Sequence, residues 1–576
     1  MRSEPRRSAA HHFLDGLVEA GIEHLFCNLG TDHVSLIEAM AQFAREGRPQ
    51  PNVVLCPHEN VAIHMAGGYA AVTGRGQGVM VHVDAGTANA AMGMHNLFRS
   101  RWPVLLMAGK SPFTVRGELV GSRDNYVHFV QDPFDIGSLV RPYVKWEYSL
   151  PSGVVAKEVL RRAHSVMHSD PPGPVYLTLP RETLAEEWPD AQVASFPAER
   201  FGPVKAGGLP ASAAREVAQA ILQAKKPVAI ASYLGRSPQA VAALEALAME
   251  CGIRVHEFMP TAMSVSRDSP CFGGFDPAKA LAGADLCLLL DTDVPWLPRF
   301  TRPDPATRFV QIDIDPLKQD FPLWGFASDL RLQADCGQAL QDVLQAVREL
   351  ADASFHDRVR ERTAGWPAER DRRLAAIADL GAQAGEPGAI APAFVCAAIN
   401  RAIAPHDIVV NEAIRNSPAV LGQILRTEPG TLLGCSGGGL GYSGGMALGA
   451  RLARPGQRVV QVVGDGGFHF STPTSVYAVA QRYRLPILTV VLDNGGWQAV
   501  KEAVLRVYPE GEAAAARQFQ AQLGGEVRRF DQVAQAFGAH GEHVTDPQQL
   551  EAALARCIAA VDRGQAAVLH VKVASL

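Results

Sequence analysis

The stretch "RVVQVVGDGGFHFSTPTSVYAVAQRYRLPILTVVLDNGG" (residues 458–496) holds two apolar, β-branched runs, each followed by polar residues and glycines. Between the runs, residues 471–483 open with serine, threonine and proline, which is typical of a helix start. We therefore expect a strand over 458–463, a helix over 471–483 and a second strand over 486–496. Such a unit has parallel strands joined by a right-handed crossover.

Asp465 and Asn494 come at the ends of these two strands. Open α/β sheets bind ligands at the carboxyl ends of their strands, so we expect the two side chains near a ligand. A carboxylate and an amide oxygen, beside glycines that let the backbone approach, favour Mg²⁺ with room for phosphate. The alternative is that Asp-Gly and Asn-Gly form ordinary turns here.

Short β-branched runs alternate with amphipathic segments along nearly the whole chain. This pattern predicts an α/β protein with three doubly wound parallel-sheet domains. A proline-rich stretch (186–210) and a breaker-rich stretch (381–392) separate the sets of strands. The predicted domains are residues 1–188, residues 208–350, which form a central Rossmann-like domain, and residues 385–576.

The composition is that of an ordinary globular protein, with 47% hydrophobic and 20% charged residues among 576. The net charge of −5 predicts no strong attraction to nucleic acid or to an anionic membrane. The nine cysteines show no metal-binding spacing, and the basic start of the chain lacks the apolar run of a secretory signal. These features predict a cytoplasmic enzyme with reduced thiols and no membrane span.

A second motif overlaps the first. Residues 439–444, "GLGYSG", fit the glycine fingerprint of dinucleotide-binding folds, and Asp465 follows at the end of the next strand. In that interpretation the acid binds a ribose hydroxyl, and the protein is an oxidoreductase. Two observations speak against the oxidoreductase: the preceding strand is only "TLLG" (431–434), and a dinucleotide site assigns no role to Asn494. The oxidoreductase remains an alternative.

"GDGG", followed one helix and one strand later by an Asn-containing turn, resembles the thiamine diphosphate (ThDP) dependent enzymes. This resemblance implies that Asp465, the Asn494 side chain and the Gly496 carbonyl ligate Mg²⁺, which holds the diphosphate of the cofactor. Gly464, Gly466 and Gly467 would lie against the same group. Two departures stand out: Asp493 precedes Asn494 where the family usually has asparagine, and the interval from GDG to the next proline is slightly longer.

The loop and helix "GGGLGYSGGMALGARLA" (437–453) resemble the family's segment beneath the cofactor. There the Gly438 carbonyl would accept a hydrogen bond from the 4′-amino group, and Leu440 would be the apolar wedge between the two rings. A simple core position is the alternative for Leu440.

The family also needs a carboxyl group beside the aminopyrimidine ring. Glu59 follows a predicted strand and precedes the small-residue helix "AIHMAGGYAAVTG" (62–74), matching the family's His-Glu pair. Burial among apolar residues raises the pKa of a carboxyl group and suits it to share a proton. A solvated surface glutamate is the alternative.

Two further segments and two single residues elsewhere bear on the substrate. By resemblance to benzoylformate decarboxylase, Thr31 in "FCNLGTDH" (26–33) and His82 in "HVDAGTAN" (82–89) would face the reacting atoms. A histidine near neutrality can move protons, although His82 also fits a buried core position. His33, Gln131 and Trp497 are weaker substrate-site candidates, each with a structural alternative.

The resemblance covers the whole chain and points to the acetolactate synthase and benzoylformate decarboxylase branch. It implies that 1–188 is an N-terminal pyrimidine-binding domain and 385–576 a C-terminal diphosphate- and Mg-binding domain. It implies attack of a C2 carbanion on a carbonyl group, most readily that of a 2-oxo acid, and an enamine that is then protonated or captured by a second carbonyl. It also implies a homodimer or homotetramer with each site at a subunit interface. The choice between decarboxylase and carboligase stays open, as do a ThDP-dependent lyase or hydrolase for another substrate and a non-catalytic scaffold. No glycine fingerprint follows "PVAIAS" (227–232), so FAD is not expected.

Overall fold

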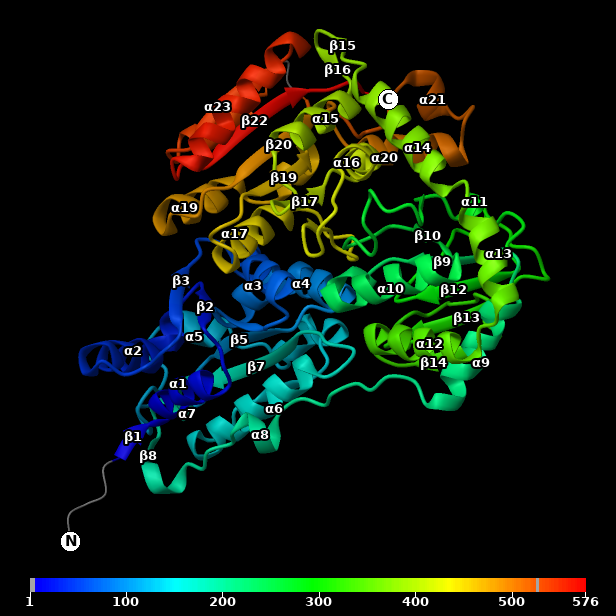
Figure 1. Cartoon of the computed structure of the whole chain (residues 1–576). Helices are drawn as coiled ribbons and strands as arrows, with labels where there is room; N and C mark the ends of the chain where they lie inside the picture. The colour runs from blue at the N-terminus through cyan, green and yellow to red at the C-terminus, as the bar shows by residue number, and fades with distance from the viewer. Residues whose placement is uncertain (1–5, 525–527, 576) are drawn as a thin grey trace. The chain divides into compact units, whose positions relative to one another are not determined.

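The computed structural model describes residues 6–524 and 528–575 (Figure 1). Within this part of the chain there are three six-stranded parallel sheets, and each has helices packed against it. The predicted α/β class with three parallel-sheet domains is therefore confirmed. The first five residues of the basic N-terminal segment lie outside the described residues.

The N-terminal domain contains the sheet of order β3-β2-β4-β5-β7-β6. Its strands are β2 His24–Cys27, β3 Asn52–Leu55, β4 Gln77–Val81, β5 Val104–Lys110, β6 Glu147–Ser149 and β7 Val175–Pro180. Its helices are α1 Ala9–Glu19, α2 Val34–Glu46, α3 Glu59–Thr73, α4 Val83–Ser100, α5 Val127–Val130, α6 Ala156–His168, α7 Arg181–Ala185 and α8 Ala198–Phe201. Two short strands, β1 Arg6–Ser8 and β8 Glu187–Pro189, pair antiparallel beside it.

The central domain contains the sheet of order β11-β10-β9-β12-β13-β14. Its strands are β9 Pro227–Ala231, β10 Arg254–Glu257, β11 Phe272–Gly274, β12 Leu286–Leu290, β13 Arg308–Asp313 and β14 Leu330–Gln333. Its helices are α9 Ala211–Gln223, α10 Pro238–Cys251, α11 Pro277–Leu281 and α12 Cys336–Leu350, followed by α13 Ala353–Thr363 and α14 Trp366–Gly381. The two last helices follow the sheet and are rich in charged residues.

The C-terminal domain contains the sheet of order β18-β17-β19-β20-β22-β21. Its strands are β17 Ile408–Glu412, β18 Leu432–Leu433, β19 Val459–Gly464, β20 Leu488–Asp493, β21 His540–Val544 and β22 Ala567–Lys572, after a small hairpin of β15 Gly385–Glu386 and β16 Ala389–Ile390. Its helices are α15 Pro392–Ala402, α16 Ser417–Gln423, α17 Ser443–Ala453, α18 Asp465–Phe470, α19 Pro473–Tyr483, α20 Gln498–Val507, α21 Glu512–Ala516, α22 Phe530–Gln535 and α23 Leu550–Asp562.

The predicted strand–helix–strand unit is present. β19 and β20 are parallel neighbours, and Gly464 lies opposite Leu492. Two details differ from the expectation. The GDGG segment itself forms the short helix α18, and α19 starts after Thr472, whose φ of 52° is left-handed and whose side chain makes no capping hydrogen bond. Pro473 still occupies the first turn, because its fixed φ suits that place.

By compactness the chain divides into two units. One combines the N-terminal domain, up to Val204, with Glu412–Arg415 and the chain from Cys435 onward; the other holds Lys205–Asn411 and Asn416–Gly434. The three domain boundaries predicted from the sequence stay a prediction.

Within the first unit, α3 packs directly on α17. A Cβ on Gly68 would lie 2.1 Å from the Met446 carbonyl oxygen, and one on Gly449 would lie 2.0 Å from the Met65 carbonyl oxygen. Since α3 is buried from Glu59 to Ala70, its small residues serve close helix packing. Glycine is therefore required at both crossing points.

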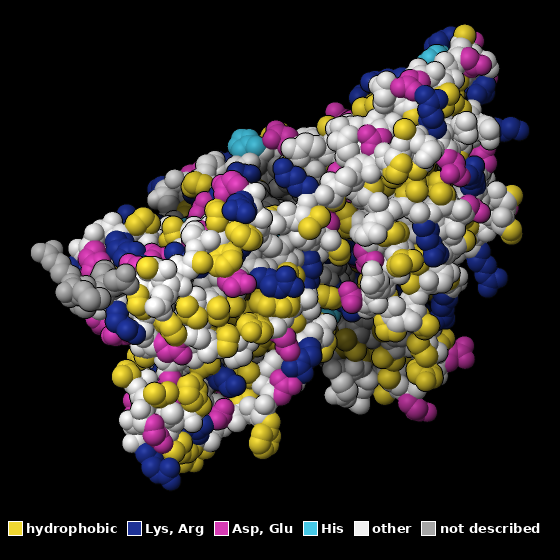
Figure 2. Space-filling view, turned by 90° about the horizontal axis from the view of Figure 1, so that it is seen from below, with side chains coloured by type: hydrophobic (Ala, Val, Ile, Leu, Met, Phe, Trp, Pro, Cys, Tyr) yellow, Lys and Arg dark blue, Asp and Glu magenta, His cyan; other side chains and the backbone are white. Residues whose placement is uncertain are grey.

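The surface carries mixed charge. Figure 2 shows hydrophobic side chains interspersed with lysine, arginine, aspartate and glutamate on the face in view. All nine cysteines lie in the described part of the chain and are free thiols, eight of them buried. Within the described ranges, no helix combines the length and hydropathy that crossing a bilayer requires.

The α3–α17 contact generates a prediction for Gly449→Ala. Alanine in a helix is favoured over glycine by about 1 kcal/mol, but the added methyl would meet a carbonyl oxygen, and overpacking costs about 1–3 kcal/mol. We expect a lower thermal unfolding midpoint, measured by circular dichroism. Gly456→Ala is the matched control because its Cβ would meet nothing within 4 Å. Equal midpoints for the two variants would contradict the close packing.

Candidate active site

The loops after β19 and β20 are joined through Asp465. Its Oδ1 accepts a hydrogen bond from the Gly466 amide (2.9 Å), and its Oδ2 accepts one from the Gly495 amide (2.9 Å). Asn494 is 7% exposed, and its Oδ1 accepts a bond from the Gly496 amide at 3.4 Å. The predicted meeting of Asp465 and Asn494 at one sheet edge is thus observed. Gly495 and Gly496 have φ of 96° and 150°, which favours glycine at both positions.

Asp493, the residue that departs from the family pattern, is bound by an arginine, a lysine and a histidine side chain. It accepts hydrogen bonds from Arg528 (2.6 Å), His570 (3.1 Å) and Lys572 (3.4 Å). Burial alone would raise the pKa of Asp493, but these partners outweigh it and hold the pKa well below its usual range. Asp493 is therefore a fixed anion supporting the turn that carries Asn494.

Asp465 has the opposite electrostatic setting. Burial, with the neighbouring Asp493 carboxylate, raises the pKa of Asp465 to about 7. Two carboxylates this close favour a cation between or beside them. No group of three or more His, Cys, Asp or Glu side chains in the described part of the chain has the arrangement of a metal site, so an ion at Asp465 would need amide, carbonyl or phosphate oxygens as further ligands.

Glu412, at the end of β17, holds the loop that precedes α17. Its carboxylate accepts hydrogen bonds from the Gly441 amide, the Ser443 amide (3.0 Å) and the Ser443 hydroxyl (2.5 Å). Burial raises the pKa of Glu412 to about 7, and these donors oppose the rise. In this loop Gly438 is exposed with open space around it, and Leu440 is only partly buried. The core alternative for Leu440 is thereby weakened.

The N-terminal domain meets this same loop within one chain. Asn60 donates to the Gly441 carbonyl (3.0 Å), while Asn96 donates to the Gly439 carbonyl (3.0 Å) and accepts from the Gly439 amide (3.1 Å). Glu59, the residue before Asn60, is 7% exposed and accepts a hydrogen bond from Asn89 (3.1 Å). Glu59 is therefore no solvated surface glutamate, and its helix delivers it to the predicted cofactor loop.

A second polar cluster surrounds His82, which precedes α4. Its Nδ1 lies 2.5 Å from Asp32 Oδ1 and its Nε2 lies 3.0 Å from Gln131 Oε1. Both ring nitrogens thus face oxygen acceptors, an arrangement that satisfies the charged imidazolium. The hydrogen bond to Asp32 raises the pKa of His82, against desolvation, which lowers it. Burial would raise the pKa of Asp32, but His33 and His82 hold it below its usual range.

The backbone around this pair is shaped to admit it. A Cβ on Gly30 would lie 1.9 Å from His82 Nδ1, and one on Gly109 would lie 1.6 Å from Asp32 Oδ2. Val83, directly after His82, has a φ of 33°, a strained value for a β-branched residue. Its amide donates to Asp32 Oδ2 at 3.3 Å. Strain held in place by a buried carboxylate is typical of functional sites.

His82 and Glu59 belong to one region of the molecule. Asn89, the partner of Glu59, lies on α4 seven residues after His82, which is about 10 Å along a helix axis. One helix therefore links the predicted proton-sharing carboxyl group and the predicted proton-moving histidine.

The remaining predicted residues differ in their surroundings. Gln131 contacts His82 and so belongs to the cluster, whereas Thr31 is exposed and its hydroxyl contacts His128 (3.2 Å). His33 is fully buried, and its Nδ1 lies 3.0 Å from the Gly30 amide nitrogen and 3.2 Å from Asp32 Oδ1, so His33 lies next to the Asp32 carboxylate. Trp497 packs over the GDGG loop, since a Cβ on Gly466 would lie 2.4 Å from its Nε1.

Sequence reasoning missed Asp32, Glu412 and the two asparagines Asn89 and Asn96. Asp32 stands in the quoted "GTDH" motif and directly precedes His33, so its polar neighbours were a usable signal. Glu412 ends a predicted strand, the position already used to select Asp465. The asparagines carried no signal, because their partners are backbone and side-chain groups far away along the chain.

The residues present fit a diphosphate cofactor bound with a metal ion. Trp497 Nε1 and Gln498 Oε1 are buried beside the Asn494 turn and have no hydrogen-bond partner among the described residues. A Cβ at Gly438 or Gly464 would meet nothing within 4 Å, so both edges of the site offer room. Asp465, the Asn494 amide oxygen and the Gly496 carbonyl supply oxygen ligands suited to Mg²⁺.

Comparisons with known proteins agree with this geometry. Residues 7–139, 214–343 and 417–571 match the N-terminal TPP-binding, central and C-terminal TPP-binding domains of thiamine pyrophosphate enzymes. Over 558 residues the chain is 27% identical to benzoylformate decarboxylase of Pseudomonas aeruginosa, with 94% of each chain covered. Over 573 residues it is 25% identical to acetolactate synthase of Bacillus subtilis, covering 95% of this chain and 90% of the relative.

Among solved structures, the thiamine diphosphate-dependent 4-hydroxybenzoylformate decarboxylase of Rhodococcus jostii RHA1 shares the fold. Its TM-score is 0.77 at 20% identity, with 99% of this chain and 100% of that chain covered. The matched domains and relatives are thiamine-dependent enzymes, so the oxidoreductase alternative for residues 439–444 is set aside. With all three domain types matched in order, the chain belongs to the thiamine pyrophosphate enzyme family and is a ThDP-dependent enzyme.

Proposed function

We propose that this enzyme uses ThDP and Mg²⁺ to cleave the carbon–carbon bond next to the carbonyl group of a 2-oxo acid. The observation that carries the proposal is the convergence of Asp465, Asn494 and the 438–441 loop with the Glu59 helix in one compact unit. The names of the relatives, a benzoylformate decarboxylase and an acetolactate synthase, support a 2-oxo acid as donor.

In this proposal Asp465, the Asn494 side chain and the Gly496 carbonyl hold the metal ion, and the GDGG loop lies against the diphosphate. Asp493, fixed by its hydrogen bonds to Arg528 and His570, keeps the Asn494 turn in place. Glu412 orients the Gly441–Ser443 backbone and with it the loop that presents Gly438. Leu440 supplies apolar contact from the same loop.

When bound, the cofactor supplies an electron sink for the bond cleavage. The side chains of the protein would hold and transfer the protons. Glu59, buried and hydrogen-bonded by Asn89, would share a proton with the aminopyrimidine ring nitrogen. His82 would hold a proton near the substrate, kept there by Asp32 and Gln131. Thr31 and the Trp497 ring would border the substrate.

The carboxyl edge of the central sheet supports the proposal that no FAD is bound tightly. Asp291 and Asp313 are buried there; Lys318 Nζ pairs with Asp313 (2.7 Å), and Arg236 pairs with Asp291 (3.2 Å). This edge therefore presents buried carboxylates where a nucleotide phosphate would need donors.

The central test is a product screen. We expect the enzyme with ThDP and Mg²⁺ to convert members of a panel of aliphatic and aromatic 2-oxo acids to aldehydes, or to hydroxyketones when acceptor aldehydes are present, read by mass spectrometry.

Glu59→Gln should keep ThDP binding and lower turnover about 100-fold. Asp465→Ala should lose ThDP binding, measured by calorimetry.

Asp379→Ala is the control, because Asp379 is an exposed helical carboxylate away from these loops. Unchanged turnover in Glu59→Gln would remove Glu59 from its role. Wild-type ThDP affinity in Asp465→Ala would remove Asp465 from the metal site.

The Asp32–His82 pair predicts a pH effect. A histidine with a raised pKa is protonated below that pKa and loses its proton as the pH rises through it. If the protonated form is active, turnover falls on the alkaline side. Asp32→Asn removes the carboxylate that raises the pKa of His82, so this fall should move to lower pH. His82→Gln should lower kcat about 100-fold. A pH profile of Asp32→Asn that matches the wild type would refute the pairing.

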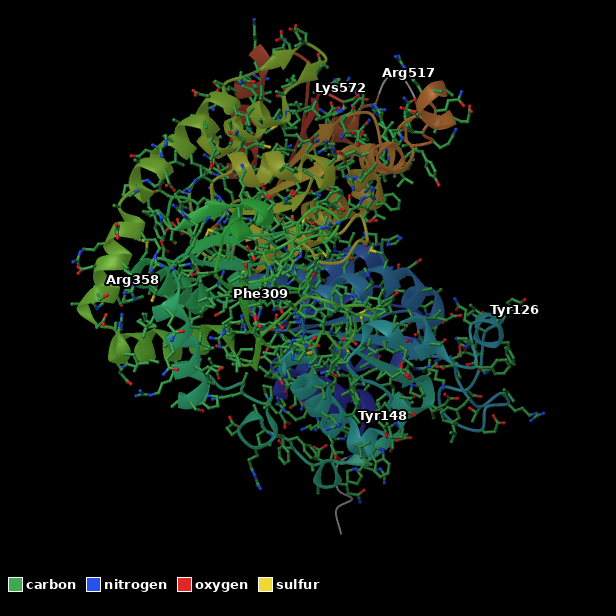
Figure 3. All side chains as sticks on the ribbon, turned by 90° about the vertical axis from the view of Figure 1, so that its right-hand side faces the viewer. Tyr126, Tyr148, Phe309, Arg358, Arg517 and Lys572 are labelled. Carbon is green, nitrogen blue, oxygen red and sulfur yellow. The ribbon has the colours of Figure 1, made fainter. Side chains whose placement is uncertain are left out.

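We further propose a homo-oligomer in the cytoplasm, with each active site at a subunit interface. Exposed hydrophobic side chains between β5 and β6 support association, among them Phe113 (58% exposed), Tyr126 (79%) and Phe134 (114%). Tyr126 projects from the N-terminal domain (Figure 3). The free cysteines suit a reducing compartment. In a single chain α3 meets α17, and exchange of the same contact between two copies would give shared sites.

Mixing two inactive variants tests the shared site. In dimers refolded together from Glu59→Gln and Asp465→Ala, a site built from two chains is intact once per mixed dimer, so activity should recover to about a quarter of wild type. A site built within one chain is never intact in such mixtures. Absence of recovery, with mixed dimers verified by mass spectrometry, would place both residues of a site on one chain.

A further inference from the structure

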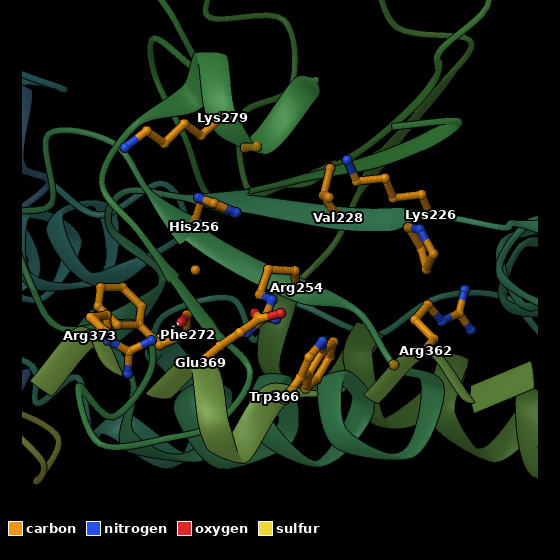
Figure 4. Close-up of a pocket in the computed structure, with 14 residues that line it drawn as sticks. Lys226, Val228, Arg254, His256, Phe272, Lys279, Arg362, Trp366, Glu369 and Arg373 are labelled. Carbon is orange, nitrogen blue, oxygen red and sulfur yellow. Dashed lines mark hydrogen bonds and ion pairs between the residues drawn. The ribbon is translucent and has the colours of Figure 1, made fainter. Parts of the chain in front are cut away.

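A cavity of about 470 Å³ lies within the central domain, away from the carboxyl edge of its sheet (Figure 4). Its walls come from the starts of β9 and β10, the edge strand β11, α11, and the helices α13 and α14. This is the amino edge of the sheet, opposite the edge that carries Asp291 and Asp313. The volume suits an organic ligand of moderate size.

The lining of this cavity is strongly basic. Its cationic side chains are Lys226, Arg254, Lys279, Arg362 and Arg373, whereas Glu369 is the one carboxylate among its lining residues. Glu369 is already ion-paired with Arg254, whose guanidinium stacks over the Trp366 ring at 4.3 Å. Burial lowers the pKa of His256 to about 4, so this lining histidine adds no charge at neutral pH.

The other cations are not neutralised by side chains. Arg362 donates to the carbonyl oxygens of Lys225 (3.2 Å) and Cys251 (2.9 Å), and Arg373 donates to those of Phe272 and Arg267 (3.0 Å). The Nε groups of Arg362 and Arg373 are buried without a partner among the described residues.

The two lysines are similarly placed. Lys226 donates to the Ala282 carbonyl, and Lys279 is exposed and makes no hydrogen bond or ion pair within the described ranges. Three carboxylates outside the lining act on its charged or titratable groups: Asp276 on His256, Asp285 on Arg362 and Asp268 on Arg373. Asp276 and Asp285 also accept hydrogen bonds from backbone amides. A concave site with this excess of positive charge attracts a multiply charged anion.

Arginine and lysine groups around a cavity are suited to phosphate oxygens, because guanidinium N–H groups bind them in pairs and an ammonium adds a point charge. The N-terminus of α14, at Trp366, adds a favourable dipole. Trp366 and Phe272 contribute aromatic edges to the wall.

We propose that this cavity is a second ligand site, which binds a diphosphate-bearing nucleotide. Two sources carry this chemistry: a free nucleoside diphosphate, and the nucleotide portion of coenzyme A, which has one additional phosphate. The site is separate from the thiamine site, and the proposal does not depend on the reaction proposed above.

The test is titration calorimetry on the holoenzyme saturated with ThDP and Mg²⁺, using ADP and coenzyme A as separate probes. We expect saturable binding of at least one probe, with tighter binding of coenzyme A if its third phosphate is recognised. Lys279→Glu should weaken binding about tenfold or more, because it reverses a charge at the rim. Lys226→Gln should weaken it less. Lys205→Glu is the matched control, an exposed lysine outside the cavity.

Asp465→Ala separates the two sites, because it should lose ThDP while keeping the affinity for the nucleotide probe. Absence of saturable binding for both probes would overturn the proposal. So would equal affinity in Lys279→Glu and Lys205→Glu, or loss of probe binding in Asp465→Ala, which would place the probe in the thiamine site. Circular dichroism checks that each variant is folded.

Discussion

The hydrogen bond from the Gly495 amide to the Asp465 carboxylate connects the two loops on which the thiamine site depends. It forms because β19 and β20 are adjacent and parallel, so their carboxyl ends meet at one edge of the sheet. The pairing of the strands brings the two loops together, and the positive φ of Gly495 and Gly496 lets the backbone after β20 approach Asp465 closely. Without this register neither Asn494 nor the Gly496 carbonyl would stand beside Asp465.

Buried carboxylates organise the rest of the site, and each is stabilised differently. Glu412 is surrounded by backbone amides and a hydroxyl, so it orders a loop. Asp493 is surrounded by cations, so it fixes a turn. Asp32 is shared by two histidines, so it sets the charge of His82. Donors and cations offset the cost of burying Glu412, Asp493 and Asp32, whereas Asp465 accepts hydrogen bonds from two backbone amides and lies beside a second carboxylate, which suits it to bind a cation.

In the central domain, the two edges of the sheet differ in charge. The carboxyl edge is closed by buried carboxylates paired with Lys318 and Arg236. At the amino edge Arg254 pairs with Glu369, whereas Arg362 and Arg373 bind carbonyl oxygens rather than carboxylates. Charge is thus distributed so that only one edge remains attractive to an anion.

The sequence by itself determined the α/β class, the strand–helix–strand unit and the positions of Glu59, Asp465 and Asn494 at element ends. Local periodicity and turn chemistry are properties of short segments, so they can be read without coordinates. Only the tertiary structure decided that Asp32 holds His82, that Glu412 holds the Gly441 loop and that Asn96 bonds to Gly439. These partners lie between 29 and 343 residues apart, and no local pattern encodes a contact at such separation.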